Sequence, residues 1–286
     1  MTTAVITSAL ELGFIYSLVA LALFLSFRVL NIADMTTDGT FTLGCAVSAT
    51  LAVAGHPYLA LPTAMLAGAC AGIITALLQT KWGVPSILAG IITNTGLYTV
   101  NLAVMGFSSN VNMMKSATIF TSFPGMKMLP AAVIAIVVAV LLVLFLSTRL
   151  GLSIRATGDN PDMVRASSIN TGFTITVGLA VSNSITALSG AVLAQYQKTA
   201  DISLGTGMVI IGLASLIIGE TIFRKGKLWA KALAAIVGCI LYRFIIAVAL
   251  RLDLPSECLK LVSAIIVAVA IALPTIRKKK GGKVAC

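Results

Sequence analysis

The chain of 286 residues is long enough for one large or two small soluble domains, but its composition excludes both. Hydrophobic residues make up 58% of it and charged residues only 10%, with a mean hydropathy of +1.05. Soluble domains carry about 25% charged residues, so this chain cannot cover a surface that faces water. We therefore expect a single membrane-embedded domain, residues 1–286. The net charge of +11 is better explained by positive charge on the cytoplasmic loops of a membrane protein than by nucleic-acid binding, so we expect no nucleic-acid partner.

Apolar segments recur along almost the whole chain, and a helix needs about 20 such residues to cross a bilayer. We predict an all-α polytopic membrane protein of about nine transmembrane helices. The expected segments are 3–27, 40–54, 59–79, 85–105, 129–147, 172–193, 205–223, 228–250 and 258–276. The second segment is short. It would cross only if part of the polar stretch 28–39 continues it within the membrane.

The basic residues orient these segments. With nine crossings, most of the 20 Lys and Arg residues lie on one side, including those of the loop 148–171 and of the basic tail 277–286. Positive charge marks cytoplasmic loops, so we place the C-terminus in the cytoplasm and the N-terminus outside. The first segment lacks the basic start of a cleavable signal peptide. The scattered cysteines predict no disulfide, and no set of residues has metal-ligand spacing.

A short sequence occurs twice before a short segment. Ala33-Asp-Met-Thr precedes the second segment and Ala200-Asp-Ile-Ser precedes the seventh, five crossings later. The two segments then run in opposite directions, which indicates an inverted repeat of segments 1–4 and 6–9. Coincidence among a small set of residue types is the alternative.

The loop 148–171 is longer than a simple connection needs to be. Asn160 can cap a helix, Pro161 suits its first position and Asp162 its first turn, so we predict a helix over 161–168. Gly158 is expected to end a preceding turn. The spacing by itself leaves open whether this helix docks on another protein or rests on lipid headgroups.

Polar residues within the apolar segments are candidates for a substrate path, because lipid cannot satisfy their hydrogen bonds. The neutral candidates are Thr93, Asn94, Thr95, Ser182, Asn183 and Ser184. Hydrogen bonding between helices is the alternative for them.

Charged residues in these segments are candidates too. Glu11 either lines the path or sits near the outer interface, and Arg243 either faces a pore or snorkels. We expect Glu220 to pair with Arg224. The Gly-x-x-x-Gly sequence at residues 68–72 predicts helix packing.

Three stretches together carry a family resemblance: 28–44, 151–170, and 187–194 followed by 207–220. The second has the spacing Gly-x-x-x-Arg-Ala-x-Gly-x-Asn. With these stretches the chain resembles permease subunits of ATP-binding-cassette importers, in the branched-chain amino acid and simple-sugar permease family. It is most similar to the branch that takes up tryptophan and other aromatic amino acids. The nine-span layout is similar to the cobalamin-importer permease without its first helix.

This resemblance implies that the loop 148–171 holds the coupling helix, which sits in a groove of an ATPase subunit. The residues assigned to coupling are Arg155, Asn160, Pro161, Asp162, Met163, Val164, Arg165 and Ser168. It also implies a solute-binding protein on the outer side and a second permease copy, in the cytoplasmic membrane of a cell.

The sequence contains no ATPase or other enzyme motif. Gly226-Lys227 lacks the first glycine and the Ser/Thr of a phosphate-binding loop, and the lone His56 cannot form a zinc motif. ATP and magnesium are therefore expected on the partner subunit, with no catalytic residue or cofactor here. The alternatives are an ion-gradient-driven transporter, a channel, or the same permease role for sugars or nucleosides.

Overall fold

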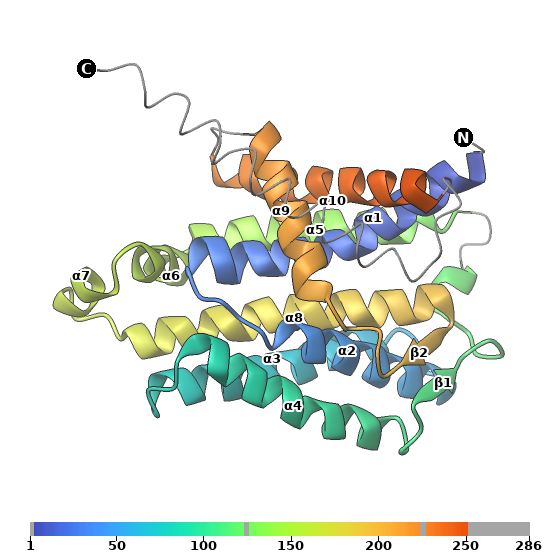
Figure 1. Ribbon diagram of the computed structural model, residues 1–286, viewed down its shortest axis with the longest axis horizontal. Helices are drawn as coiled ribbons and strands as arrows, with labels where there is room; N and C mark the ends of the chain where they lie inside the picture. The colour runs from blue at the N-terminus through green and yellow to red at the C-terminus, as the bar shows by residue number, and fades with distance from the viewer. Residues whose placement is uncertain (1–2, 123–125, 224–226, 251–286) are drawn as a thin grey trace.

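The computed structural model describes residues 3–122, 126–223 and 227–250. The ninth expected segment, 258–276, and the basic tail 277–286 lie outside the described residues. Within them the elements occur in the following order (Figure 1): α1 (Thr3–Leu23), the π-helix η1 (Phe24–Val29), α2 (Thr37–Val53), α3 (Ala60–Thr80), α4 (Ser86–Val104), β1 (Asn110–Asn112), the 3₁₀-helix η2 (Ile119–Ser122), α5 (Met128–Ser147), α6 (Arg149–Asp159), α7 (Pro161–Ala166), α8 (Thr171–Gln197), β2 (Thr199–Asp201), α9 (Met208–Ile222) and α10 (Leu228–Leu250).

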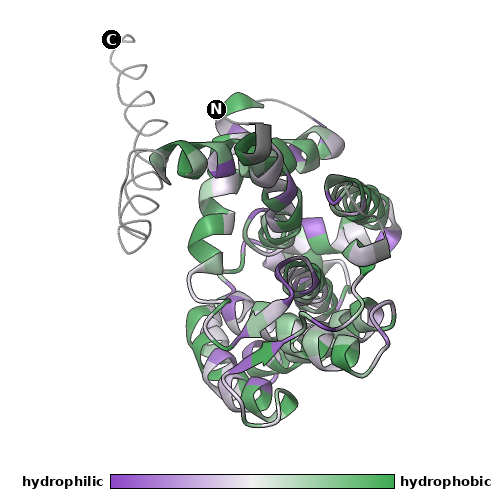
Figure 2. Cartoon of the chain, turned by 90° about the vertical axis from the view of Figure 1, so that its right-hand side faces the viewer, coloured by the Kyte–Doolittle hydropathy of each residue, from purple (hydrophilic) through white to green (hydrophobic). Residues whose placement is uncertain are grey.

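The structure is mostly helical, which is compatible with the expected all-α polytopic membrane protein. Among the described residues, six helices are long and apolar enough to cross a membrane: α1 with η1, α3, α4, α5, α8 and α10. The second and seventh expected segments form the shorter helices α2 and α9, of 17 and 15 residues. Large apolar side chains are exposed along α4 and α5, as expected for surfaces in contact with lipid or another apolar partner. Figure 2 shows hydrophobic residues along most of the helices.

The helices form two groups that meet where α1 packs against α8. In one group α8 contacts α2 and α3, and α4 covers α2. In the other α1 contacts α5, α9 and α10. Figure 1 shows α9 steeply inclined to the other long helices. The helices α6 and α7 project at one end of the molecule, and β1 pairs antiparallel with β2 at the other.

Glycines allow α3 to approach α8 closely. A Cβ on Gly68 would lie 2.5 Å from the backbone oxygen of Asn183, and one on Gly72 would collide with the backbone of Leu179. The predicted packing role of this Gly-x-x-x-Gly sequence is confirmed. Gly44 does the same for α2, because a Cβ there would collide with the Ala187 backbone.

Two details of the loop 148–171 were predicted wrongly. Gly158 does not end a turn but lies inside α6, where its missing side chain makes room for the Val29 carbonyl of η1. The second helix ends at Ala166, not at residue 168. Ser168 follows it in the left-handed region at φ 61°, a conformation that an α-helix does not contain.

Candidate functional site

A buried polar cluster fixes the break between η1 and α2. The Asp34 carboxylate accepts the backbone N–H of Thr36 at 2.9 Å and the side-chain amide of Asn183 at 2.7 Å. The Thr40 hydroxyl lies 2.7 Å from Asn183 Oδ1. These four side chains are all buried. Because an apolar interior cannot satisfy polar groups, the cluster locks the start of α2 onto α8.

A second carboxylate ties α2 to α9. The two Asp38 oxygens accept the backbone N–H groups of Gly207 and Val209, both at 2.9 Å. These amides belong to the N-terminus of α9, where a helix offers unpaired donors and favours negative charge. Gly207 has φ 86°, which suits glycine. The first turn of α9 is therefore capped by a side chain from a helix far away in sequence.

A polar cleft of about 340 Å³ opens beside this cap. It lies between α2, α4 and the turn that joins β2 to α9. Its lining residues are mostly neutral and polar, with one carboxylate: Asp38, Gly39, Thr42, Asn94, Thr95, Tyr98, Asn101, Ile202, Gly205 and Thr206. Such a lining offers several hydrogen-bonding groups to a small polar solute.

Asn101 is the deepest polar residue of the cleft, only 2% exposed. Its Nδ2 donates to the Gly39 carbonyl at 3.1 Å, while its Oδ1 is buried without a partner among the described residues. Tyr98 and Asn101 were not predicted from the sequence. Their spacing from Asn94, four and seven residues along α4, could have found them, because it places all three on one helix face.

The predicted path residues separate into two groups. Asn94 and Thr95 line the cleft, whereas Thr93 is buried and donates within α4 to Ala89 O. Ser182 is buried and donates to Ala22 O at 2.8 Å, so it links α8 to α1. For Ser182 and Asn183 the structure favours the helix-to-helix alternative. Neither these two nor the half-buried Ser184 lines the cleft.

The charged candidates have partners elsewhere. Glu11 accepts the Tyr196 hydroxyl at 2.7 Å, away from the cleft. Arg243 does not snorkel: its guanidinium lies over the Tyr16 ring, 3.6 Å from the centroid. Glu220 pairs with Arg28 of η1, and Arg224, its expected partner, lies outside the described residues.

The loop after α5 has the predicted cap. Asn160 Oδ1 accepts the backbone N–H groups of Asp162 and Met163, both at 3.1 Å, and Pro161 opens α7. Arg165 donates to Asp162 Oδ1 at 3.3 Å and to Thr171 Oγ1 at 3.1 Å. These bonds hold the short helix in one orientation relative to α8.

The apolar residues of α7 differ in burial. Met163 is 65% exposed, whereas Val164 is 3% exposed and packs against the protein itself. Val164 therefore anchors α7, while Met163 and Ala166 are exposed and free to contact another surface. The exposed Arg155 lies on the adjacent helix α6, at the same end of the molecule (Figure 1).

Comparison with known proteins decides the family. Residues 5–276 match the family described as branched-chain amino acid transport system, permease component. The chain belongs to this permease family. It is the membrane permease component of an ATP-binding-cassette transport system. The match covers all the described helices from residue 5 onward.

The relatives of this permease transport different solutes. It is 35% identical over 268 residues to the tyrosine transport system permease protein of Clostridioides difficile (strain R20291), covering 93% of this chain and 90% of the relative. It is 24% identical over 246 residues to the ribose import permease protein of Haemophilus influenzae (83% and 75% covered). Identity to the D-allose transport system permease protein of Escherichia coli (strain K12) is 29% over 238 residues (79% and 70%). No solved structure matches the chain.

Proposed function

We propose that this permease is one membrane subunit of a binding-protein-dependent importer, in which α6 and α7 transmit ATP hydrolysis by a separate ATPase subunit. ATP and magnesium belong to that subunit. The end of the molecule with α6 and α7 then faces the cytoplasm, as does the C-terminus. The N-terminus and the β1–β2 sheet face outward across the cytoplasmic membrane.

The observation that carries this proposal is the construction of α7. Its backbone is fixed by the Asn160 cap and the Arg165 bonds, Val164 holds it to the bundle, and Met163 projects outward. A helix held in this way, with Met163 and Ala166 exposed, suits transmission of force, because movement of a docked partner would be passed on to α8. A helix resting on lipid would need a continuous apolar face instead.

We propose the polar cleft as part of the solute path. Asp38, Asn94, Thr95 and Tyr98 provide groups for the charged and polar ends of a small solute. An amino acid, aromatic first, is the proposed solute, since the relative with 35% identity transports tyrosine and the exposed Tyr98 ring suits an aromatic side chain. Glu11 and Ser184 are left out of this path.

Helix α4 forms one wall of the cleft and also carries exposed apolar side chains, and this supports a second permease copy. Exposed apolar residues continue along the same helix, among them Ile87, Leu88, Ile91 and Ile92. We propose that a homodimer closes the path there. We also propose that the chain crosses the membrane nine times and contains the inverted repeat. The ninth crossing would lie after residue 250.

The binding protein is proposed to dock on the outer loops. These include the turn at His56, the loop of residues 115–127 and the turn after α8 at residues 198–201. The stretch 251–257, also expected there, lies outside the described residues. Strand β2 leads directly into the turn that lines the cleft. A binding protein docked at residues 198–201 would therefore act on the cleft.

Co-purification of the cognate ATPase with Met163→Glu tests the coupling role. Burying a methionine side chain contributes about 1.5–3 kcal/mol, and each 1.4 kcal/mol is tenfold in affinity. We expect at least a tenfold loss of ATPase binding. Met114→Glu is the matched control, because Met114 is 74% exposed near the opposite end of the molecule. Equal ATPase recovery with both variants would contradict the docking of α7.

Uptake into proteoliposomes tests the cargo and the driving force. The complete system should accumulate labelled tyrosine or another aromatic amino acid only with internal ATP and the binding protein. Accumulation of ribose in its place would assign the cleft to sugars, as in the ribose and allose relatives. Accumulation driven by an ion gradient without ATP would refute the importer mechanism.

A further inference from the structure

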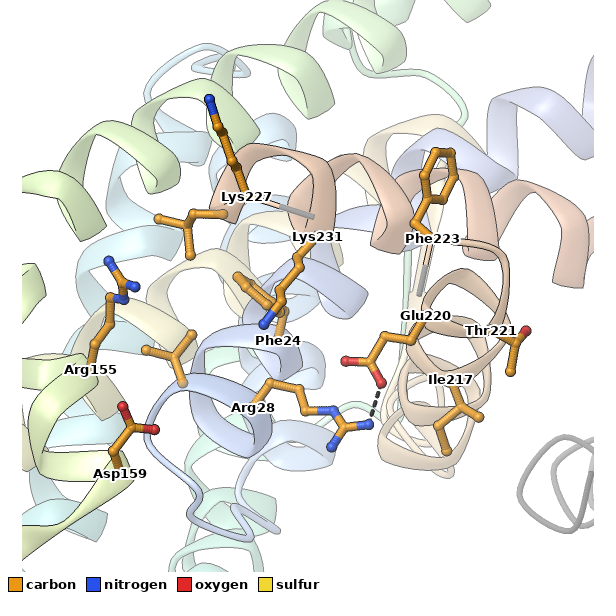
Figure 3. A pocket seen from close by; sticks show the side chains of 12 residues that line it. Phe24, Arg28, Arg155, Asp159, Ile217, Glu220, Thr221, Phe223, Lys227 and Lys231 are labelled. Carbon is orange, nitrogen blue, oxygen red and sulfur yellow. Dashed lines mark hydrogen bonds and ion pairs between the residues drawn. The ribbon is translucent and has the colours of Figure 1, made fainter. Parts of the chain in front are cut away.

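A second cavity, of about 660 Å³, lies at the end of the molecule that carries α6 (Figure 3). It is bordered by η1, α6, the end of α9 and the start of α10. Part of its wall is apolar: Phe24, Val29, Ile217, Phe223 and Leu228. The solute cleft shares no lining residue with it.

The charges of this cavity are unbalanced. Four basic side chains line it, Arg28, Arg155, Lys227 and Lys231, but only two carboxylates, Asp159 and Glu220. Glu220 is already paired with Arg28. Among the described residues, no carboxylate lies within ion-pair distance of the other three cations. Figure 3 shows the Lys231 side chain reaching into the space between Arg28 and Arg155.

The surroundings place the cavity at the level of lipid headgroups. Trp229 is 55% exposed in the first turn of α10, and Phe223 is exposed at the end of α9. Exposed aromatic residues at helix ends mark the boundary between the hydrocarbon and the headgroups. A ligand in this cavity would contact cations on the side that faces water and an apolar wall on the side that faces the membrane interior.

We propose that this cavity binds an anionic phospholipid, with its phosphate among Arg155, Lys227 and Lys231 and an acyl chain along the apolar wall. Guanidinium and ammonium groups form strong charge-assisted hydrogen bonds with phosphate oxygens. Basic pockets between membrane helices on the cytoplasmic side suit such headgroups. The bound lipid would join α6, which leads into the coupling helix, to α10. The proposal is independent of the transported solute.

Tryptophan fluorescence provides the test, because the chain contains two tryptophans. In a Trp82→Phe background, Trp229 reports from beside the cavity. The full chain is reconstituted in phosphatidylcholine vesicles with a small fraction of either brominated phosphatidylglycerol or brominated phosphatidylcholine. Bromine quenches a nearby indole. We expect phosphatidylglycerol to quench far beyond its share of the bilayer.

Neutralising Arg155 and Lys231 together (R155Q, K231Q) should weaken this preference about 30-fold, which corresponds to about 1 kcal/mol for each removed cation. Lys81→Gln is the matched control, since Lys81 is an exposed cation just after α3, near the start of α8 but outside the cavity. Unchanged quenching by brominated phosphatidylcholine in the double variant shows that the protein is folded.

Three results would overturn the assignment. Equal quenching by the two brominated lipids in the Trp82→Phe protein would show that no selective site exists. An equal loss of the preference for phosphatidylglycerol in Lys81→Gln would show that the effect comes from general surface charge. Displacement by millimolar inorganic phosphate at constant ionic strength would assign the cavity to a soluble phosphate instead of a lipid.

Discussion

The cap that Asp38 places on α9 allows a quantitative prediction, since it joins the cleft beside α4 to a helix of the other group. The Asp38→Ala variant removes both acceptors from the amides of Gly207 and Val209. Hydrogen bonds to charged groups contribute about 1.5–3 kcal/mol each in a protein interior. Asp38 is half-buried and lines an open cleft, so water replaces part of what is lost.

We therefore expect Asp38→Ala to cost as much free energy as other substitutions of a helix N-cap by alanine, about 0.5–2 kcal/mol. Local opening of the first turn of α9 should become about tenfold more frequent, because 1.4 kcal/mol is a factor of ten. Asp38→Asn keeps one acceptor oxygen without the charge, and we expect about half of this free-energy change.

Hydrogen–deuterium exchange measured by mass spectrometry reads this opening directly, since amide exchange follows local unfolding. Exchange should accelerate in a peptide over 207–212 and stay constant in α5. Asp162→Ala is the control, because Asp162 is an exposed carboxylate in α7, which projects at one end of the molecule away from α9 (Figure 1). If Asp38→Ala and Asp162→Ala give the same exchange in the 207–212 peptide, the cap does not stabilise α9 and the reasoning fails.

Two further predictions concern packing and pH. Gly44→Ala should destabilise the protein by about 1–3 kcal/mol in thermal unfolding, because the new methyl group collides with the Ala187 backbone. Gly96→Ala, which meets no atom within 4 Å, should be neutral or stabilising by about 0.5–1 kcal/mol, and the opposite order would contradict the α2–α8 contact. At the end of β2, hydrogen bonds from Ser203 hold the pKa of Asp201 below its ordinary value. The contribution of Asp201 to the free energy of unfolding should be complete above the unfolded pKa of about 3.9 and should disappear as the pH falls through the lowered pKa. Unfolding temperatures measured over a series of pH values test this. The Asp201→Asn variant should lack that acid dependence.

The helices themselves were largely predictable. Apolar length located the described spans to within a few residues, because the cost of exposing a backbone to lipid is a local property of each segment. The cap at Asn160 followed equally from its own neighbours, Pro161 and Asp162. The helix end at Ala166 was missed, as was the role of Gly158, which depends on the backbone of η1.

What the sequence by itself determined is the class of molecule, the positions of the apolar helices and the local form of the loop 148–171. The tertiary structure alone decided which polar residues share a space. Asp34 contacts Asn183, 149 residues away, and Asp38 contacts Gly207 at the start of α9, 169 residues away. Nothing in the local sequence pattern distinguishes a hydroxyl or amide that faces a neighbouring helix from one that faces the cleft. Polar side chains in an apolar environment take whichever partner the packing brings near, so their roles are set only when the helices assemble.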